Sequence, residues 1–243
     1  MKNVKYLLAL IAAVIISVNL PAQTVEQIIE KHVEALGGFG NMNAVKTIRV
    51  TGSAKVMGLD IPYMTCNIAP NKTYFEMSVQ GLAVKQAYDG TTAWMINPMS
   101  GSKSAEVVEG DDAKNIIDRG NIFGKLTTYK EDGAKLELVG KDKVRDEEAY
   151  KLVYTDSNGK NSTYYISTKS NLVVKVEKKI SANGEEKDSE TIFSDYRKTG
   201  NVTMAYGMNT KVKNSAMGSQ IIVIDKIEIN PELDEAMFSM PVN

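Results

Sequence analysis

From Lys46 almost to its end, the sequence places apolar residues at every second position, and no other feature limits the fold as strongly. Side chains of a β-strand alternate between two faces, so a period of two predicts strands that each bury one face. Ile48 and Val50 begin this series, and Ile227 and Ile229 end it. The sequence therefore predicts a mainly β protein with about ten strands.

Turn residues separate these strands, among them the pairs Asp89-Gly90 and Asn158-Gly159. Asparagine, aspartate and glycine tolerate the positive φ angles of tight hairpin turns, so successive strands are expected to pair in antiparallel fashion. A sheet with this many strands must curl or split. We expect an α+β fold in which a curled antiparallel sheet forms a half-open barrel.

Two segments depart from the period of two and are expected to form short amphipathic helices. The first begins at Thr24, which makes a capping box with the glutamine three residues later, and it ends at Gly37. The second lies in residues 110–126, where Asp111 or Asp112 can cap a short helix. Each helix has one apolar face, so both are expected to cover the concave side of the sheet as a movable lid.

The N-terminus carries the pattern of a cleavable export signal. Two lysines in the first five positions precede an apolar run over residues 6–20, which small residues follow. The run is shorter than the roughly 20 residues that span a bilayer. We expect a signal peptide at 1–22 and a single mature domain at 24–243 in the periplasm. The only cysteine, Cys66, lies far from the cleavage site, so no lipid anchor is expected.

Composition argues against most classes of enzyme and against nucleic-acid binding. The formal net charge is −1, and no basic stripe follows any predicted element. His32 is the only histidine, which excludes sites with several histidines and leaves no plausible triad. Asp156-Ser157-Asn158-Gly159 lacks the glutamate of a calcium loop and fits a hairpin turn better. We therefore expect a non-enzymatic protein without a metal or cofactor.

Three stretches together resemble the LolA family of periplasmic proteins that sort bacterial outer-membrane lipoproteins. They are Ala69-Pro70-Asn71-Lys72, the hairpin YDGTTAWMINP at 88–98, and MFSMP at 237–241. The resemblance implies an open β-barrel with helices over its mouth and an apolar cavity for the acyl chains of a lipoprotein or another lipid. Members of the family commonly have an arginine before the Pro-Asn pair, thought to latch the lid, where this chain has Ala69.

Apolar positions of the strands and of the second helical segment are the expected lining of this cavity. The set is Ile48, Val50, Met64, Phe75, Met77, Leu82, Val84, Trp94, Ile96, Ile116, Ile117, Phe123, Leu172, Val174, Ile221 and Val223. Trp94 follows the Asp89-Gly90 turn, which is expected to place it on the same face as Leu82 and Val84. Its fluorescence would then report ligand binding. Many methionines lie in or beside the strands, and they suit either an adaptable cavity or ordinary core packing.

The predicted function is that of a monomeric periplasmic carrier for lipid or lipoprotein acyl chains. It would contact membranes only peripherally and could have an envelope protein as a partner. A sensor or regulator with the same fold remains an alternative, although such a protein usually has a second domain, and the sequence marks no boundary for one. A purely structural module is the other alternative.

Overall fold

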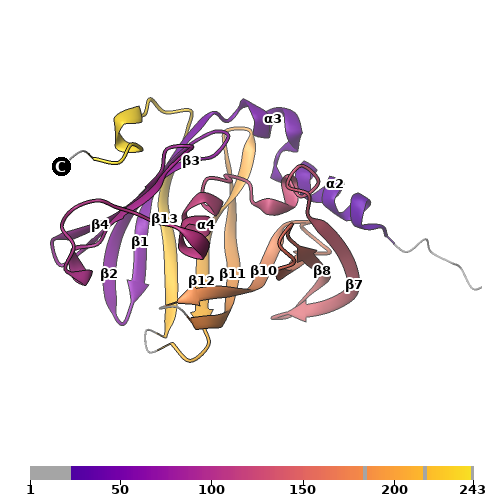
Figure 1. Ribbon diagram of the computed structural model, residues 1–243. Helices are drawn as coiled ribbons and strands as arrows, with labels where there is room; N and C mark the ends of the chain where they lie inside the picture. Colours follow the sequence, from indigo (N-terminus) through magenta and orange to yellow (C-terminus); the bar gives the residue numbers. More distant parts are fainter. Residues whose placement is uncertain (1–22, 183–184, 216–217, 242–243) are drawn as a thin grey trace, which may run out of the picture.

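The structure is a computed structural model that describes residues 23–182, 185–215 and 218–241 (Figure 1). The expected signal peptide at 1–22 lies outside the described residues. Three α-helices are present in the described part, together with three short 3-10 helices. Their bounds are α2 Val25–Leu36, α3 Gly38–Ala44, α4 Gly110–Asp118, η1 Pro98–Ser100, η2 Lys125–Thr127 and η3 Glu235–Met237. None of the helices described is long and apolar enough to cross a membrane.

All strands of the described chain belong to one antiparallel sheet of thirteen strands. In chain order they are β1 Thr47–Val56, β2 Leu59–Ile68, β3 Lys72–Val79, β4 Leu82–Tyr88, β5 Ala93–Ile96, β6 Glu106–Val107, β7 Lys135–Val144, β8 Glu147–Thr155, β9 Asn161–Ser167, β10 Val173–Ala182, β11 Glu185–Thr199, β12 Val202–Val212 and β13 Ser219–Ile229. In space β6 to β1 follow one another, β13 to β7 continue the sheet, and β13 pairs with β1. The two edges, β6 and β7, do not pair with each other.

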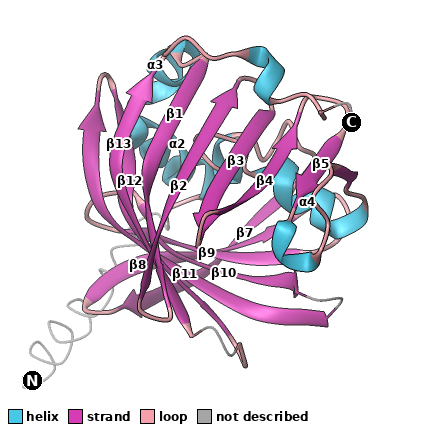
Figure 2. Cartoon of the chain, turned by 90° about the vertical axis from the view of Figure 1, so that its left-hand side faces the viewer, coloured by secondary structure: helices cyan, strands magenta, loops and turns pink. Residues whose placement is uncertain are grey.

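The sheet curls so that β8–β11 cross behind and below β1–β4 (Figure 2). This is the expected half-open barrel with short helices, and the fold class is confirmed. The expected strand number was too low because β6, β11 and β12 were missed. Two-residue β6 is too short for a pattern, and β11 has charged or polar residues at most positions, so neither strand shows an apolar alternation.

The first helix, α2, begins and ends as the sequence predicts. Thr24 and Gln27 form the capping box, and Gly37 ends the helix with a φ of 123°. A Cβ atom on Gly37 would lie 2.4 Å from the Asn201 carbonyl oxygen, so the close approach of β12 also requires glycine. Gly38 starts the short helix α3, which the sequence did not predict.

The concave face of the sheet holds the largest buried cluster, and α2 lies at its centre. Ile28, Ile29 and Val33 of α2 pack with Leu152 of β8 and Val202 of β12. Contacts of α2 with β7, β12 and η2 close one end of the curl. Burial of this extent indicates that α2 is a fixed plug. The better candidate for a movable lid is α4 with the segment after it.

The convex face of β2–β5 is also buried, because the C-terminal segment packs against it. Trp94 and Phe238 are each 1% exposed, and the Trp94 Nε1–H donates to the Phe238 carbonyl oxygen over 2.8 Å. Cys66 and Tyr74 complete this cluster. The convex face of this half of the sheet is therefore apolar and covered by the C-terminal segment.

Candidate functional site

The concave face of β1–β5 presents side chains that are only partly covered. The strand register brings Val50, Thr65, Phe75, Gln86 and Met95 opposite one another in a row across β1–β5. All five are half-buried, which leaves a wide, mainly apolar surface within reach of a ligand.

A second row continues this surface toward the middle of the sheet. Phe193, Met208, Ile222 and Ala54 lie opposite one another across β11, β12, β13 and β1. Met208 and Ile222 pack against a buried cluster formed by Ile48, Tyr206, Ile224 and Ile227, and neither is fully buried. Apolar surface thus extends over both halves of the curl.

The segment after α4 seats on the first row through Arg119. The Asn67 Nδ2–H donates to the Arg119 carbonyl oxygen over 2.5 Å, and the Arg119 guanidinium donates to Gln86 Oε1 and lies 4.9 Å from the centre of the Phe75 ring. Enclosure by the curled sheet lowers the pKa of Arg119 through desolvation, although its side chain remains accessible to water. The Arg119 guanidinium therefore lies inside the curl of the sheet and remains in contact with water.

Close backbone packing fixes the same segment at the β2–β3 turn. A Cβ atom on Gly120 would lie 2.4 Å from the Asn71 carbonyl oxygen, so only glycine fits. Ala69 lies at the same turn, and its methyl side chain can make no hydrogen bond to the segment. Asn67, two residues earlier, makes the connection to the Arg119 carbonyl oxygen instead.

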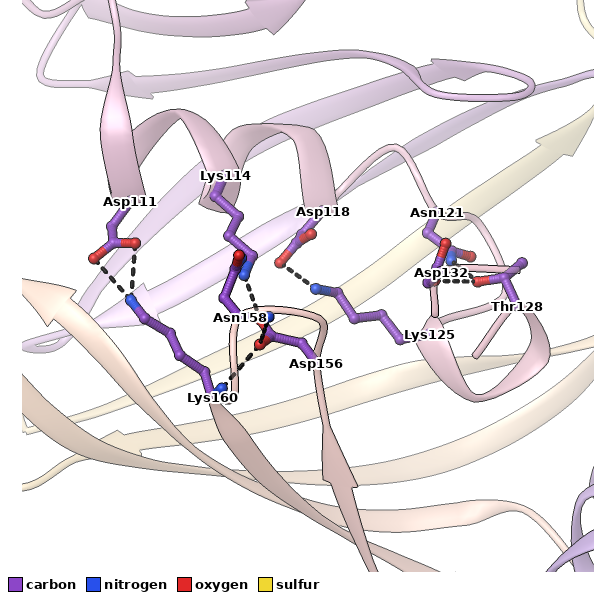
Figure 3. Close-up of polar contacts among 10 residues, drawn as sticks. All are labelled: Asp111, Lys114, Asp118, Asn121, Lys125, Thr128, Asp132, Asp156, Asn158 and Lys160. Carbon is purple, nitrogen blue, oxygen red and sulfur yellow. Dashed lines mark hydrogen bonds and ion pairs between the residues drawn. The ribbon is translucent and has the colours of Figure 1, made fainter. Parts of the chain in front are cut away.

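At its other side, α4 is tied by ion pairs to the turn between β8 and β9 (Figure 3). Lys114 pairs with Asp156, and Lys160 donates to Asp111 over 2.8 Å. Burial raises the pKa of Asp156, but hydrogen bonds from Lys114 and from the backbone amides of Lys160 and Asn158 outweigh it and keep the pKa below its ordinary value. Asp111 therefore binds across to the hairpin and does not cap α4. The N-cap residue is Glu109, which makes no side-chain cap bond.

Two adjoining clefts lie on either side of these ion pairs. The larger, of about 680 Å³, opens between α3, the β2–β3 turn and the segment after α4, and its apolar wall includes Phe39, Met42 and Phe123. The smaller, of about 400 Å³, lies between α4 and strands β9 and β10. Both are lined by Lys114, Asp118, Lys125, Tyr154 and Asp156.

The structure brings about half of the expected lining residues to the concave side or to the helical segment over it. Phe75, Met77 and Val84 share the face that carries Val50, and Ile117 and Phe123 line the larger cleft. Ile48 and Leu172 are buried in concave clusters, as Ile116 is in α4. Leu82 lies at the tip of the β3–β4 hairpin and is largely exposed. A ligand-binding role for these residues remains a prediction.

Six expected residues lie on the convex face, and their placement in the cavity was wrong. Met64, Trp94 and Ile96 belong to the cluster covered by Phe238, because Trp94 pairs with Ala87 and not with the Val84 side of β4. Val174 packs with Tyr165 on the convex side of β10. Ile221 and Val223 are 40% and 39% exposed, since their neighbours Ile222 and Ile224 take the inner positions of β13.

Residues of the clefts that the sequence did not single out are charged or phenolic. Lys178, Tyr154 and Tyr164 carry no local motif, and only the fold brings them together. His32 is buried in α2, where its Nδ1 lies 2.9 Å from the Asn171 carbonyl oxygen, so it serves the core. The described residues contain no group of histidine, cysteine and acidic side chains that could hold a metal ion.

No family model and no curated protein matches the sequence. Solved structures do match. A LolA superfamily protein from Nitrosomonas europaea is 12% identical with a TM-score of 0.60, and the match covers 90% of this chain and 98% of that one. A DUF1329 family protein from Desulfovibrio piger gives the same identity, coverage and TM-score. A domain assigned as an outer membrane lipoprotein-sorting protein, from Vibrio parahaemolyticus, is 12% identical with a TM-score of 0.55 over 87% of this chain and 94% of that one.

The chain has a LolA-like fold. This finding confirms the resemblance that the 69–72, 88–98 and 237–241 stretches indicate. Within the LolA-like fold of this chain, the 88–98 hairpin and the 237–241 stretch pack against each other on the convex face through Trp94 and Phe238. The match shows the fold alone.

Proposed function

We propose that the protein is a non-enzymatic carrier that holds a lipid or the acyl chains of a lipoprotein on its concave face. The observation that carries the proposal is the half-buried apolar surface formed by the rows through Phe75 and Met208, beneath a helical segment seated by polar and backbone contacts. Partly exposed apolar side chains on a concave face favour an apolar occupant, because burying apolar surface gains about 25 cal/mol per Å².

We further propose that the carrier is a single domain, 24–243, that works as a monomer in the periplasm after removal of 1–22. N-terminal sequencing of the protein recovered from the periplasmic fraction tests the export step. Recovery of a chain that still begins at Met1, or that stays with membranes after carbonate washing, would contradict it.

Neighbouring residues of β13 give a matched test of the binding face. Ile222 points to the concave cluster, and Ile221 is 40% exposed on the convex face. Ile222→Glu is expected to lower the affinity of delipidated protein for a fluorescent fatty acid by roughly tenfold or more, because the bound acyl chain would remove water from the new carboxylate. Ile221→Glu is expected to leave the affinity unchanged. Equal effects of the two variants, with circular dichroism showing both folded, would place the ligand elsewhere.

A further inference from the structure

The smaller cleft has one lysine more than it has carboxylates. Its four acidic side chains each pair with a lysine, namely Asp111 with Lys160, Asp118 with Lys125, Asp156 with Lys114 and Glu186 with Lys179. Lys178 is the fifth lysine of the lining, and its ammonium group makes no ion pair or hydrogen bond to any described residue. The cleft therefore presents one uncompensated positive charge.

Residues with hydroxyl groups lie next to Lys178 in the sheet. Tyr154, Ser162, Lys178 and Ser189 lie opposite one another across β8–β11, and Tyr164 lies one row further along β9. The hydroxyls of Tyr154, Ser162 and Tyr164, which line the cleft with Lys178, make no hydrogen bond to the described part of the chain. Burial raises the pKa of Tyr154 to about 12, so it stays a proton donor at neutral pH.

The side chain of Lys178 is exposed to solvent, yet it lies in the cleft between α4, β9 and β10 and not on an open surface. Desolvation lowers the pKa of Lys178, and the nearby cations Lys125 and Arg119 lower it further, against the opposing effect of Asp118. A bound anion would relieve this unfavourable field, since an opposite charge stabilises the charged form of the lysine. Among the charged groups of the cleft, Lys178 is the one that a ligand can neutralise.

We propose that this cleft binds the anionic head group of the carried molecule, a carboxylate or a phosphate, with Lys178 as its counter-ion. The ligand class is then an acidic amphiphile, an inference that rests on the proposed carrier function. The smaller cleft adjoins the larger one along Tyr154 and Asp118, so a chain attached to the head group enters the larger cleft. Ile122 lines the larger cleft and packs against the concave cluster beside Met208 and Ile222, so the chain continues from there onto the concave face. The Tyr154, Ser162 and Tyr164 hydroxyls donate the remaining hydrogen bonds to its oxygens.

The test compares matched probes on the delipidated full chain by titration calorimetry at low salt. Palmitate and palmitoyl lysophosphatidate carry the two anionic head groups, hexadecanol is the neutral analogue, and acetate and inorganic phosphate lack the chain. Hydrogen bonds to charged groups contribute enough for a preference of roughly 10- to 100-fold for the anionic amphiphiles over hexadecanol. Lys178→Gln is expected to abolish this preference and leave the affinity for hexadecanol unchanged.

Lys141→Gln is the control, because Lys141 pairs with Glu148 over 2.8 Å between β7 and β8 and lines neither cleft. It should retain the preference. Equal affinity of the unaltered protein for palmitate and hexadecanol, or a preference that survives in Lys178→Gln, would overturn the head-group proposal and leave the carrier function standing. Binding of acetate or phosphate as tight as that of the amphiphiles would show a site for free anions and overturn it as well. Failure of every chain-bearing probe to bind would refute the carrier function itself.

Discussion

Gly120 gives the sharpest test of how the segment after α4 is seated. In Gly120→Ala the new Cβ atom would meet the Asn71 carbonyl oxygen at 2.4 Å, where an ordinary contact begins at 3.4 Å, so the segment must retreat by about 1 Å. Such a shift breaks the 2.5 Å hydrogen bond from Asn67 to the Arg119 carbonyl oxygen. Asn67 is buried, so losing this hydrogen bond leaves its side-chain amide unsatisfied and costs about 1–3 kcal/mol.

The assay is hydrogen exchange of the 110–128 peptides together with urea unfolding. We expect exchange in this segment to accelerate roughly 10- to 100-fold and the free energy of unfolding to fall by about 1–3 kcal/mol. Gly40→Ala is the control, since Gly40 lies within α3 and a Cβ atom there would meet no other atom within 4 Å. That change should stabilise the protein by about 0.5–1 kcal/mol. Exchange of Gly120→Ala at the rate of the unaltered protein would refute this seating of the segment.

Three further predictions concern the buried core. Phe238→Ala should destabilise the protein by about 3–5 kcal/mol and shift Trp94 emission to longer wavelength in fluorescence scans. A lipid titration should leave Trp94 emission unchanged, because Trp94 lies on the convex face, away from the ligand. A large ligand-induced change would contradict this convex placement. Burial lowers the pKa of His32 below 6.5, against the weaker opposing effect of its hydrogen bond to Asn171, so the unfolded chain binds more protons below that pH. The free energy of unfolding should therefore fall by up to about 1.4 kcal/mol for each pH unit below 6.5. Urea unfolding at pH 7.5, 6.5 and 5.5 should show that His32→Gln removes this pH dependence. The same pH dependence in the variant and the unaltered protein would refute the role of His32.

The two sides of the helical segment are held by different chemistry. Near the β2–β3 turn, Gly120 and Asn67 make close backbone packing and a buried hydrogen bond, which salt does not weaken. Near the β8–β9 turn, Lys114 and Lys160 make ion pairs, and those that are exposed contribute less than about 1 kcal/mol and are screened by salt. The weaker side borders the cleft that contains Lys178, so a charged head group would enter where opening costs less.

The strand alternation identified most strands but could not assign their faces. Trp94 and Ile96 do alternate as predicted, yet Val84 and Phe75 on the neighbouring strands form an equally apolar opposite face. A period of two shows that a face is buried and does not show what covers it. The covering element for Trp94 is Phe238, far along the chain, and no local signal in the hairpin predicts that contact.

The alternation also could not assign faces within a continuous apolar run, and it could not identify a functional lysine in a charged strand. In Ile221-Ile222-Val223-Ile224 every position is apolar, so the pattern fits either face, and the bulge that shifts the β1–β13 register fixes the choice only in three dimensions. Lys178 lies in a strand with neighbouring lysines and a glutamate, where the sequence suggests a solvated surface. Its lack of a partner depends on which carboxylates Lys114, Lys125 and Lys160 neutralise across the curl. These ion pairs form only in the folded chain, so the sequence alone does not show that the Lys178 charge lacks a partner.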